Sequence, residues 1–162
     1  MNDWMEALEA SGWVVAFSKS VFWFGLVTVV HYFTLFFMTG AVVALNLRVL
    51  GLVATDTKAS DFADEIFPWI WISMILAVIS GFGLALVQAG DYYRDPVTRT
   101  KIVICFLGFL CTWYIRRNVP NWESEKSVSM PAAAKVASLV CLFLWFAAVL
   151  AGADIAAISG LG

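Results

Sequence analysis

The sequence predicts an all-α integral membrane protein, a four-helix bundle with a short N-terminal interfacial helix. Composition is the first reason: 62% of the 162 residues are hydrophobic, 14% are charged and the mean hydropathy is +0.85, whereas soluble domains contain about 45–50% apolar and roughly 25% charged residues. Charge-free stretches are the second reason, because a bilayer-spanning helix needs about 20 mostly apolar residues. Four stretches contain no Asp, Glu, Lys or Arg: residues 20–47, 66–90, 102–115 and 136–153.

The N-terminal segment precedes the first of these stretches. Residues 3–17 start with Asp3 and Glu6, a spacing typical of a helix N-terminus, and then place apolar residues near one side of a helix. We therefore predict a short helix that lies in the membrane interface. Because this acidic start does not resemble a cationic leader, no cleaved signal peptide is expected.

The first two predicted spans cover about residues 21–47 and 67–88. The second is predicted to begin at Pro68, because the missing amide proton of proline costs nothing in the first turn of a helix. Small residues recur at every fourth position of this span, which lets another helix approach closely. These residues are Ala77, Gly81, Ala85 and Ala89.

The third and fourth predicted spans cover about residues 101–116 and 133–158. The third reaches membrane width only if Lys101 and Arg116 extend their side chains toward the headgroups. The fourth carries another stripe of small residues, formed by Ala148, Gly152, Ala156 and Gly160. We therefore interpret residues 1–162 as a single transmembrane domain.

Charge argues against several function classes. The chain holds 10 Lys and Arg against 12 Asp and Glu, a net charge of −2, and has no basic block. Nucleic-acid binding is therefore not expected. No nucleophile, carboxylate pair or phosphate-binding loop stands out, so the residues alone predict no enzyme class.

His31 is the only histidine of the chain. If the first span begins near Val21, His31 lies about 15 Å along it, inside a hydrocarbon core about 30 Å thick. Ionisable side chains at this depth usually face the bundle interior and often mark function. Three roles are open: an interhelical hydrogen bond that fixes packing, axial ligation of a heme iron, and proton relay or quinone contact. Candidate hydrogen-bond partners are Ser73, Ser80, Thr112 and Ser138.

A heme site would also need a set of axial ligands. A bis-histidine cytochrome uses two histidines per iron, and this chain supplies one. The iron would then be five-coordinate, be shared across an oligomer, or take another residue such as Met74, Cys105 or Cys111 as its sixth ligand. The cysteines, including Cys141, otherwise suit small apolar packing positions, because they form no C-x-x-C motif.

Two cations lie at the ends of predicted spans. Arg48 follows His31 by 17 residues, or about 25 Å along a helix. At that interface a guanidinium could bind lipid phosphate, an acidic loop residue or a heme propionate. Lys101 begins the third span on the opposite membrane side, where anchoring at the headgroups is its default role.

Four motifs follow one another in the sequence: LEASGW, HYFTLFFMTGAVVALNLRVLGL, FPWIWISMILAVISGFGLAL and YYRDPVTRTK. Their order resembles a bacterial family of small four-helix membrane proteins of unknown function. The resemblance covers residues 7 to about 155, and its most specific part is the set His31, Gly40 and Asn46-Leu47-Arg48. The layout is more distantly similar to HemJ-type membrane protoporphyrinogen oxidases, which bind heme, and to CopD-type copper-resistance membrane proteins.

The HemJ-type resemblance implies roles for three residues. His31 corresponds to a heme-associated histidine, Arg48 to an arginine at the end of helix one, and Lys101 to a lysine that opens helix three. By this resemblance, the protein would bind heme b through these residues. It would lie in the bacterial inner membrane and take part in membrane redox chemistry or electron transfer. Such families often have another histidine in helix three, where this chain has Cys111-Thr112.

A non-catalytic subunit is the alternative function. His31 would then make only a packing hydrogen bond, and the small-residue stripes would be contact faces for a second copy or a larger membrane complex, with membrane lipid around them. Copper or small-ion handling ranks last, because one His, five Met and three Cys form no M-x-x-M or C-x-x-C cluster.

Overall fold

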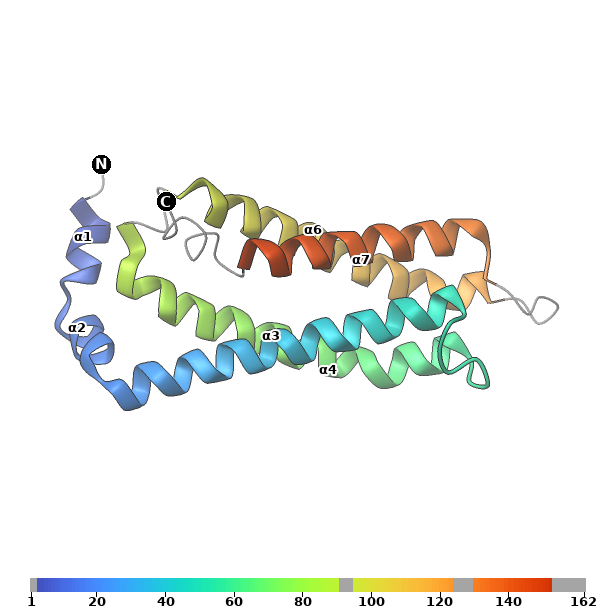
Figure 1. The fold of residues 1–162 in the computed structure, drawn as a ribbon, viewed down its shortest axis with the longest axis horizontal. Coiled ribbons are helices and arrows are strands. Elements are labelled where there is room, and N and C mark those ends of the chain that lie inside the picture. Colours follow the sequence, from blue (N-terminus) through green and yellow to red (C-terminus); the bar gives the residue numbers. More distant parts are fainter. Residues whose placement is uncertain (1–2, 91–94, 124–129, 153–162) are drawn as a thin grey trace.

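Four long helices form the body of the molecule in a computed structural model, which describes residues 3–90, 95–123 and 130–152 (Figure 1). Two short helices precede them, and a short 3-10 helix follows α4. The elements are α1 (Asp3–Glu9), α2 (Gly12–Lys19), α3 (Val21–Leu50), α4 (Ala59–Ala85), η1 (Leu86–Gln88), α6 (Pro96–Trp122) and α7 (Ala132–Gly152). The predicted all-α bundle is confirmed.

The long helices are arranged as two hairpins, α3 with α4 and α6 with α7 (Figure 1). The hairpins meet through contacts of α3 with α7 and of α4 with α6. We call the end that carries α1 and α2 the N-terminal end. The opposite end, where residues 51–58 join α3 to α4, is called the loop end.

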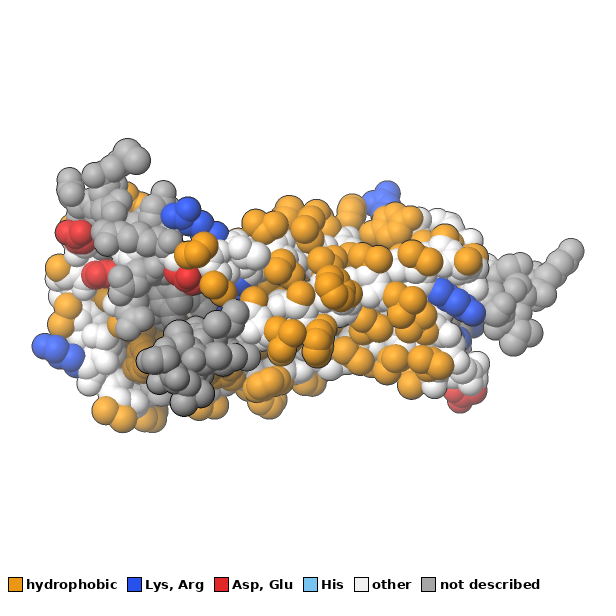
Figure 2. Space-filling model, turned by 45° about the horizontal axis from the view of Figure 1, so that its top comes forward, with side chains coloured by type: hydrophobic (Ala, Val, Ile, Leu, Met, Phe, Trp, Pro, Cys, Tyr) orange, Lys and Arg blue, Asp and Glu red, His pale blue; other side chains and the backbone are white. Residues whose placement is uncertain are grey.

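All four long helices are long and apolar enough to cross a membrane. Their outward side chains are large and hydrophobic: Phe36 is 69% exposed and Phe143 is 71% exposed. Hydrophobic side chains cover the middle of the molecule, while charged side chains gather toward its two ends (Figure 2). Such a continuous apolar surface is far larger than soluble monomers expose, and this agrees with the predicted membrane-spanning bundle.

The buried core lies mainly in the half of the bundle nearest the loop end. In α3 the buried residues begin at Thr34 and continue to Val49. In α6 they begin at Gly108 and continue to Val119. Within the described residues, neither helix has a buried side chain nearer the N-terminal end, so the hairpins pack most closely at the loop end.

Helix ends differ from the prediction at two prolines. The second long helix begins at Ala59, so Pro68 lies inside it rather than at its start. The third begins at Pro96 rather than near residue 101, because Asp95 caps its first turn. The α4 helix continues through Pro68, which has no amide proton and so cannot donate a hydrogen bond to the carbonyl of Asp64.

The structure also bears on the predictions for the N-terminal segment and for the fourth long helix. The interfacial helix is two helices, α1 and α2, that meet at a turn around Ser11. In α2, Val14 is buried while Trp13 is 58% exposed, as expected of a helix that presents one side to lipid headgroups. The fourth long helix is described to Gly152, so the predicted continuation to residue 158, with Ala156 and Gly160, lies outside the described residues.

Candidate functional site

His31 lies on α3 and contacts α4. Its Nδ1 atom is 3.0 Å from the carbonyl oxygen of Ala77 and 3.1 Å from Oγ of Ser80. A carbonyl only accepts hydrogen bonds, so Nδ1 carries the imidazole proton. The hydroxyl of Ser80 donates to the carbonyl of Leu76 at 2.6 Å, which leaves Ser80 Oγ free to accept as well. In a neutral imidazole with this tautomer, Nε2 carries a lone pair.

Gly81 makes room for this imidazole. A methyl group at Gly81 would lie 2.8 Å from Cε1 of His31 and 3.3 Å from its Nδ1. Carbon atoms prefer separations of about 3.5–4.0 Å. The absence of a side chain at Gly81 therefore lets the ring approach α4 closely and reach both acceptors.

The predicted small-residue stripe, of which Ala89 lies beyond the end of α4, is used in part within the chain. Ala77 is 6% exposed, and Gly81 contacts His31. Two of the four residues thus face α3. Within the described residues, this pairing accounts for the small side chains at these two positions without a second copy of the chain.

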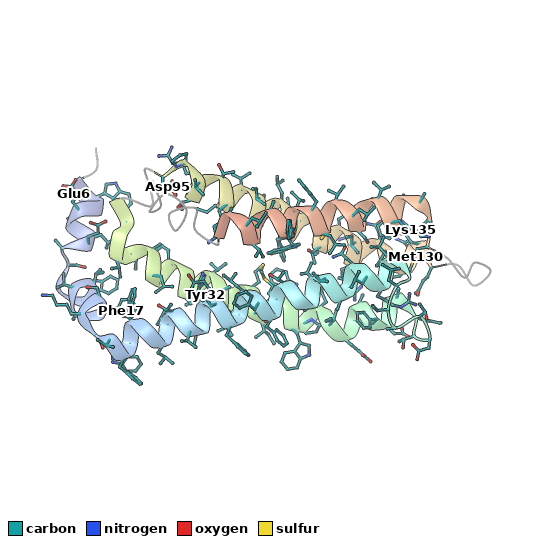
Figure 3. The ribbon with its side chains drawn as sticks, viewed as in Figure 1. Glu6, Phe17, Tyr32, Asp95, Met130 and Lys135 are labelled. Carbon is teal, nitrogen blue, oxygen red and sulfur yellow. The ribbon has the colours of Figure 1, made fainter. Side chains whose placement is uncertain are left out.

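Lys101 and His31 belong to the same half of the bundle. Lys101 lies on the second turn of α6 and is half-buried. His31 directly precedes Tyr32 on α3, and Figure 3 shows Tyr32 between Phe17 at the N-terminal end and Lys135 at the loop end. Two of the three predicted site residues therefore lie in the same half of the bundle, and the hydrogen bonds of His31 go to Ala77 and Ser80.

Arg48 lies near the loop end and binds the loop. Its Nε donates to the carbonyl of Thr57 at 3.0 Å, and a second guanidinium nitrogen donates to the same oxygen. The loop follows Gly51, whose φ of 78° places it in the left-handed region that ends α3. The contact of Arg48 is therefore a backbone carbonyl of the loop, which was not among its predicted partners, rather than an acidic loop side chain.

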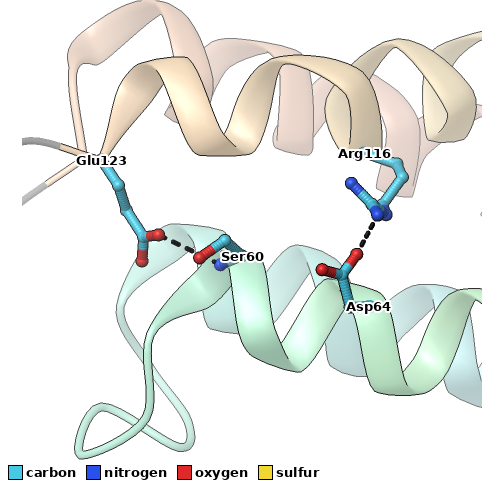
Figure 4. A network of polar contacts seen from close by, with 4 residues as sticks. All are labelled: Ser60, Asp64, Arg116 and Glu123. Carbon is cyan, nitrogen blue, oxygen red and sulfur yellow. Dashed lines mark hydrogen bonds and ion pairs between the residues drawn. The ribbon is translucent and has the colours of Figure 1, made fainter.

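A polar network joins α4 to α6 at the loop end (Figure 4). The carboxylate of Glu123 accepts hydrogen bonds from the backbone amides of Ala59 and Ser60, which are the first two residues of α4. One turn further along α4, Asp64 pairs with Arg116. Burial alone would raise the pKa of Glu123, but hydrogen bonds from Ser60 and Ala59 and the charge of Arg48 hold this pKa below its usual value.

Asp95 fixes the start of α6 at the other end of the bundle. Its carboxylate accepts from the Thr98 hydroxyl at 2.7 Å, from the Thr98 amide at 2.8 Å and from the Val97 amide at 3.1 Å. The Thr98 hydroxyl contributes most to a pKa below the usual value for Asp95. This cap sets the start of the helix that carries Lys101.

The residues considered as a sixth iron ligand have different surroundings. Cys111 donates to the carbonyl of Ala137 on α7 at 3.6 Å, so its thiol is used within the α6–α7 hairpin. Met74 packs against the core, and Cys105 lies one turn after Lys101. Among the described residues, no three His, Cys, Asp or Glu side chains are grouped closely enough to hold a metal ion.

An apolar groove of about 420 Å³ lies elsewhere, between α3 and α7. Thr39 and Val43 line it from α3, and five residues between Leu142 and Val149 line it from α7. None of the three predicted site residues lines this groove. The candidate site is therefore the contact of His31 with α4, in the less tightly packed half of the bundle, where Lys101 also lies.

Residues 5–158 of the chain match the family of unknown function DUF6644, and the chain belongs to this family. No curated protein and no solved structure matches the chain. The resemblance to a family of small membrane proteins of unknown function is therefore confirmed.

Proposed function

We propose that this member of DUF6644 is a bacterial inner-membrane protein that binds heme b through Nε2 of His31 and takes part in membrane redox chemistry or electron transfer. One observation carries the proposal: the hydrogen bond from Nδ1 to the carbonyl of Ala77. Histidines that ligate metals almost always donate their other ring N–H to a carbonyl, a carboxylate or water, which fixes the tautomer and the ring orientation. His31 has this arrangement.

The residues around His31 suit one axial ligand. Gly81 lets the imidazole lie against α4, and the bonds to Ala77 and Ser80 hold its orientation. Among the described residues, Nε2 has no hydrogen-bond partner that would compete with a metal. The chain has one histidine, so the donor set fits an iron with a single imidazole ligand rather than a bis-histidine pair.

Lys101 and the apolar helices supply the rest of such a site. Lys101 lies half-buried on α6 in the same half of the bundle as His31, and an ammonium there would attract a heme carboxylate. Arg48 is bound to the loop, so we assign the carboxylate contact to Lys101 rather than to Arg48. When bound, heme supplies one-electron redox chemistry, while the protein orients the group and sets its electrostatic surroundings.

An absorption spectrum tests this proposal. The protein is expressed with adequate heme, purified in detergent and compared with His31→Asn, whose side-chain amide can still donate to Ala77 but lacks an imidazole. Thr28→Val is a matched control, because Thr28 lies on the same helix and its hydroxyl donates only to the carbonyl of Phe24. We expect a Soret band in the wild-type protein and in Thr28→Val, and its loss in His31→Asn. An equal band in all three proteins would refute ligation by His31.

A non-catalytic subunit of a membrane complex is the second candidate. The observation that favours it is that the hydrogen bond of His31 to α4 is sufficient by itself to explain a half-buried imidazole as a packing device. In this case a partner copurifies with the wild-type protein and with His31→Asn alike, and neither carries a Soret band.

A further inference from the structure

Five buried side chains meet where α3, α6 and α7 pack together. Four of them are 0% exposed and Trp145 is 4% exposed. The other four are Asn46 on α3, Thr112 on α6, and Ser138 and Cys141 on α7. This cluster lies apart from His31 and takes no part in the proposed heme site.

Most hydrogen bonds in the cluster have a defined direction. The Thr112 hydroxyl donates to the carbonyl of Gly108 at 2.8 Å and accepts from Nε1 of Trp145 at 3.0 Å. Since its proton is used, the contact of 3.3 Å between Thr112 Oγ1 and Cys141 Sγ requires the thiol to donate. The sulfur of Cys141 then accepts from Nδ2 of Asn46 at 3.5 Å. A chain of hydrogen bonds thus crosses the core from α3 to α6.

Two buried polar atoms of the cluster have no hydrogen-bond partner among the described residues. They are Oδ1 of Asn46 and Oγ of Ser138. A buried polar group without a partner costs about 1–3 kcal/mol, so such atoms are usually satisfied by something else, often a bound water.

Exchanging the oxygen and the nitrogen of the Asn46 amide would not give every polar atom a partner. Nδ2 donates to the carbonyl of Val42 at 2.8 Å. A flipped amide would place an oxygen against that carbonyl oxygen, with no proton between them. The orientation with Oδ1 free is therefore the favourable one.

The two residues with unpartnered atoms are related through Cys141. Asn46 contacts Cys141, and Ser138 precedes Cys141 by three residues on α7. Residues three apart on a helix lie on the same side. Ser138 therefore lies on the side of α7 that Cys141 presents to Asn46, about one turn away along the helix.

We propose that the interface between α3 and α7 holds a buried water molecule that donates to Oδ1 of Asn46 and bonds the hydroxyl of Ser138. Water fits because an amide oxygen needs a donor, whereas a hydroxyl can donate or accept. Buried waters typically make about three hydrogen bonds to groups that are otherwise unsatisfied. Two uncharged oxygens are too few for a cation, since hard cations such as Ca²⁺ take about six to eight oxygen ligands. The water would tie α3 to α7 in the apolar core.

A double-mutant cycle tests the proposal on the full chain in mixed micelles, with reversible unfolding by sodium dodecyl sulfate. The variants are Ser138→Ala, Asn46→Leu and the double variant. If a water joins the two residues, Ser138→Ala raises the unfolding equilibrium constant roughly tenfold. The double variant then unfolds much less readily than the product of the two single effects predicts, because the shared water is lost only once.

Thr34→Ala combined with Asn46→Leu is the matched control. Thr34 is also buried, but its hydroxyl donates only within α3, to the carbonyls of Val30 and His31. Its effect and that of Asn46→Leu should multiply. If Ser138→Ala instead leaves the unfolding constant unchanged or lowers it, the hydroxyl has no partner and the proposal is overturned.

A direct readout is a crystal or electron-microscopy map with enough detail to show ordered water. Density within hydrogen-bond distance of both Oδ1 of Asn46 and Oγ of Ser138 is the expected result. A direct bond between the two side chains, or an empty interface between them, would overturn the proposal even if the two substitutions were coupled.

Discussion

Replacing Gly81 by alanine is the most informative change to the His31 contact. The added methyl carbon would lie 2.8 Å from Cε1 of His31. Carbon atoms prefer about 3.5–4.0 Å, so the ring has to move by roughly 0.7–1.2 Å. A displacement of that size away from α4 lengthens the bonds from Nδ1 to Ala77 and Ser80, now 3.0 and 3.1 Å, beyond hydrogen-bonding range.

The energetic cost has two parts. Overpacking of a well-packed contact costs typically 1–3 kcal/mol, and an interhelical hydrogen bond in a membrane protein contributes about 0.6 kcal/mol on average and up to about 1.7. Alanine also gains about 0.5–1 kcal/mol over glycine as a helix former, so we expect Gly81→Ala to lower the free energy of unfolding by about 1–4 kcal/mol. Reversible unfolding in mixed micelles, followed by tryptophan fluorescence, measures this value.

Gly83→Ala is the matched control on the same helix. Its added methyl group would meet only Cγ1 of Val27, at 4.0 Å, which is ordinary contact. Alanine is a better helix former than glycine by about 0.5–1 kcal/mol, so this variant should be as stable as the wild type or slightly more so. In a His31→Ala background the cost of Gly81→Ala should largely vanish. If Gly81→Ala proves as stable as Gly83→Ala, the reasoning about the imidazole contact is refuted.

Three further predictions concern other parts of the bundle. Asp95→Ala should lower the thermal midpoint because α6 loses its cap, with Asp95→Asn keeping more of it; equal midpoints for the two variants would argue against the cap. The folded-state pKa of Glu123 lies below the usual value, so its carboxylate stabilises the fold at pH values above the usual glutamate pKa. That contribution disappears as the pH falls through the folded-state pKa. Glu123→Gln should therefore lose less stability in acid than the wild type does. An identical pH dependence of stability in the two proteins would contradict this. Trp145→Phe should lower the free energy of unfolding by about 1 kcal/mol, because the buried hydroxyl of Thr112 loses a donor; a variant of wild-type stability would mean that this bond contributes nothing.

The existence of the four spans could be read from the sequence, but their ends could not. Absence of charge marks where a helix crosses hydrocarbon, whereas a helix can continue beyond the membrane into water. The helix α4 starts at Ala59 although Asp61 and Asp64 lie in its first turns, and Asp64 finds a cation on α6. The capping side chain of Glu123 comes from a distant part of the sequence, so local patterns around Ala59 do not reveal it.

The site could be predicted only in part for a related reason. A lone histidine in a charge-free stretch indicated a buried partner, and Ser80 was among the partners considered. The main acceptor is the backbone carbonyl of Ala77. Every residue has a backbone carbonyl, so the sequence does not reveal which one accepts. Gly81 was recognised as a packing residue, but its contact with His31 depends on the register between α3 and α4, which only tertiary packing sets. The same holds for Arg48, whose acceptor is the backbone of Thr57.

The absorption spectrum of the purified protein tests the central claim most directly. Wild-type protein expressed with adequate heme should show a Soret band, and His31→Asn, which keeps a donor for Ala77, should lack it while remaining folded. A wild-type protein without a Soret band, or a band that survives in His31→Asn, would contradict heme ligation by His31.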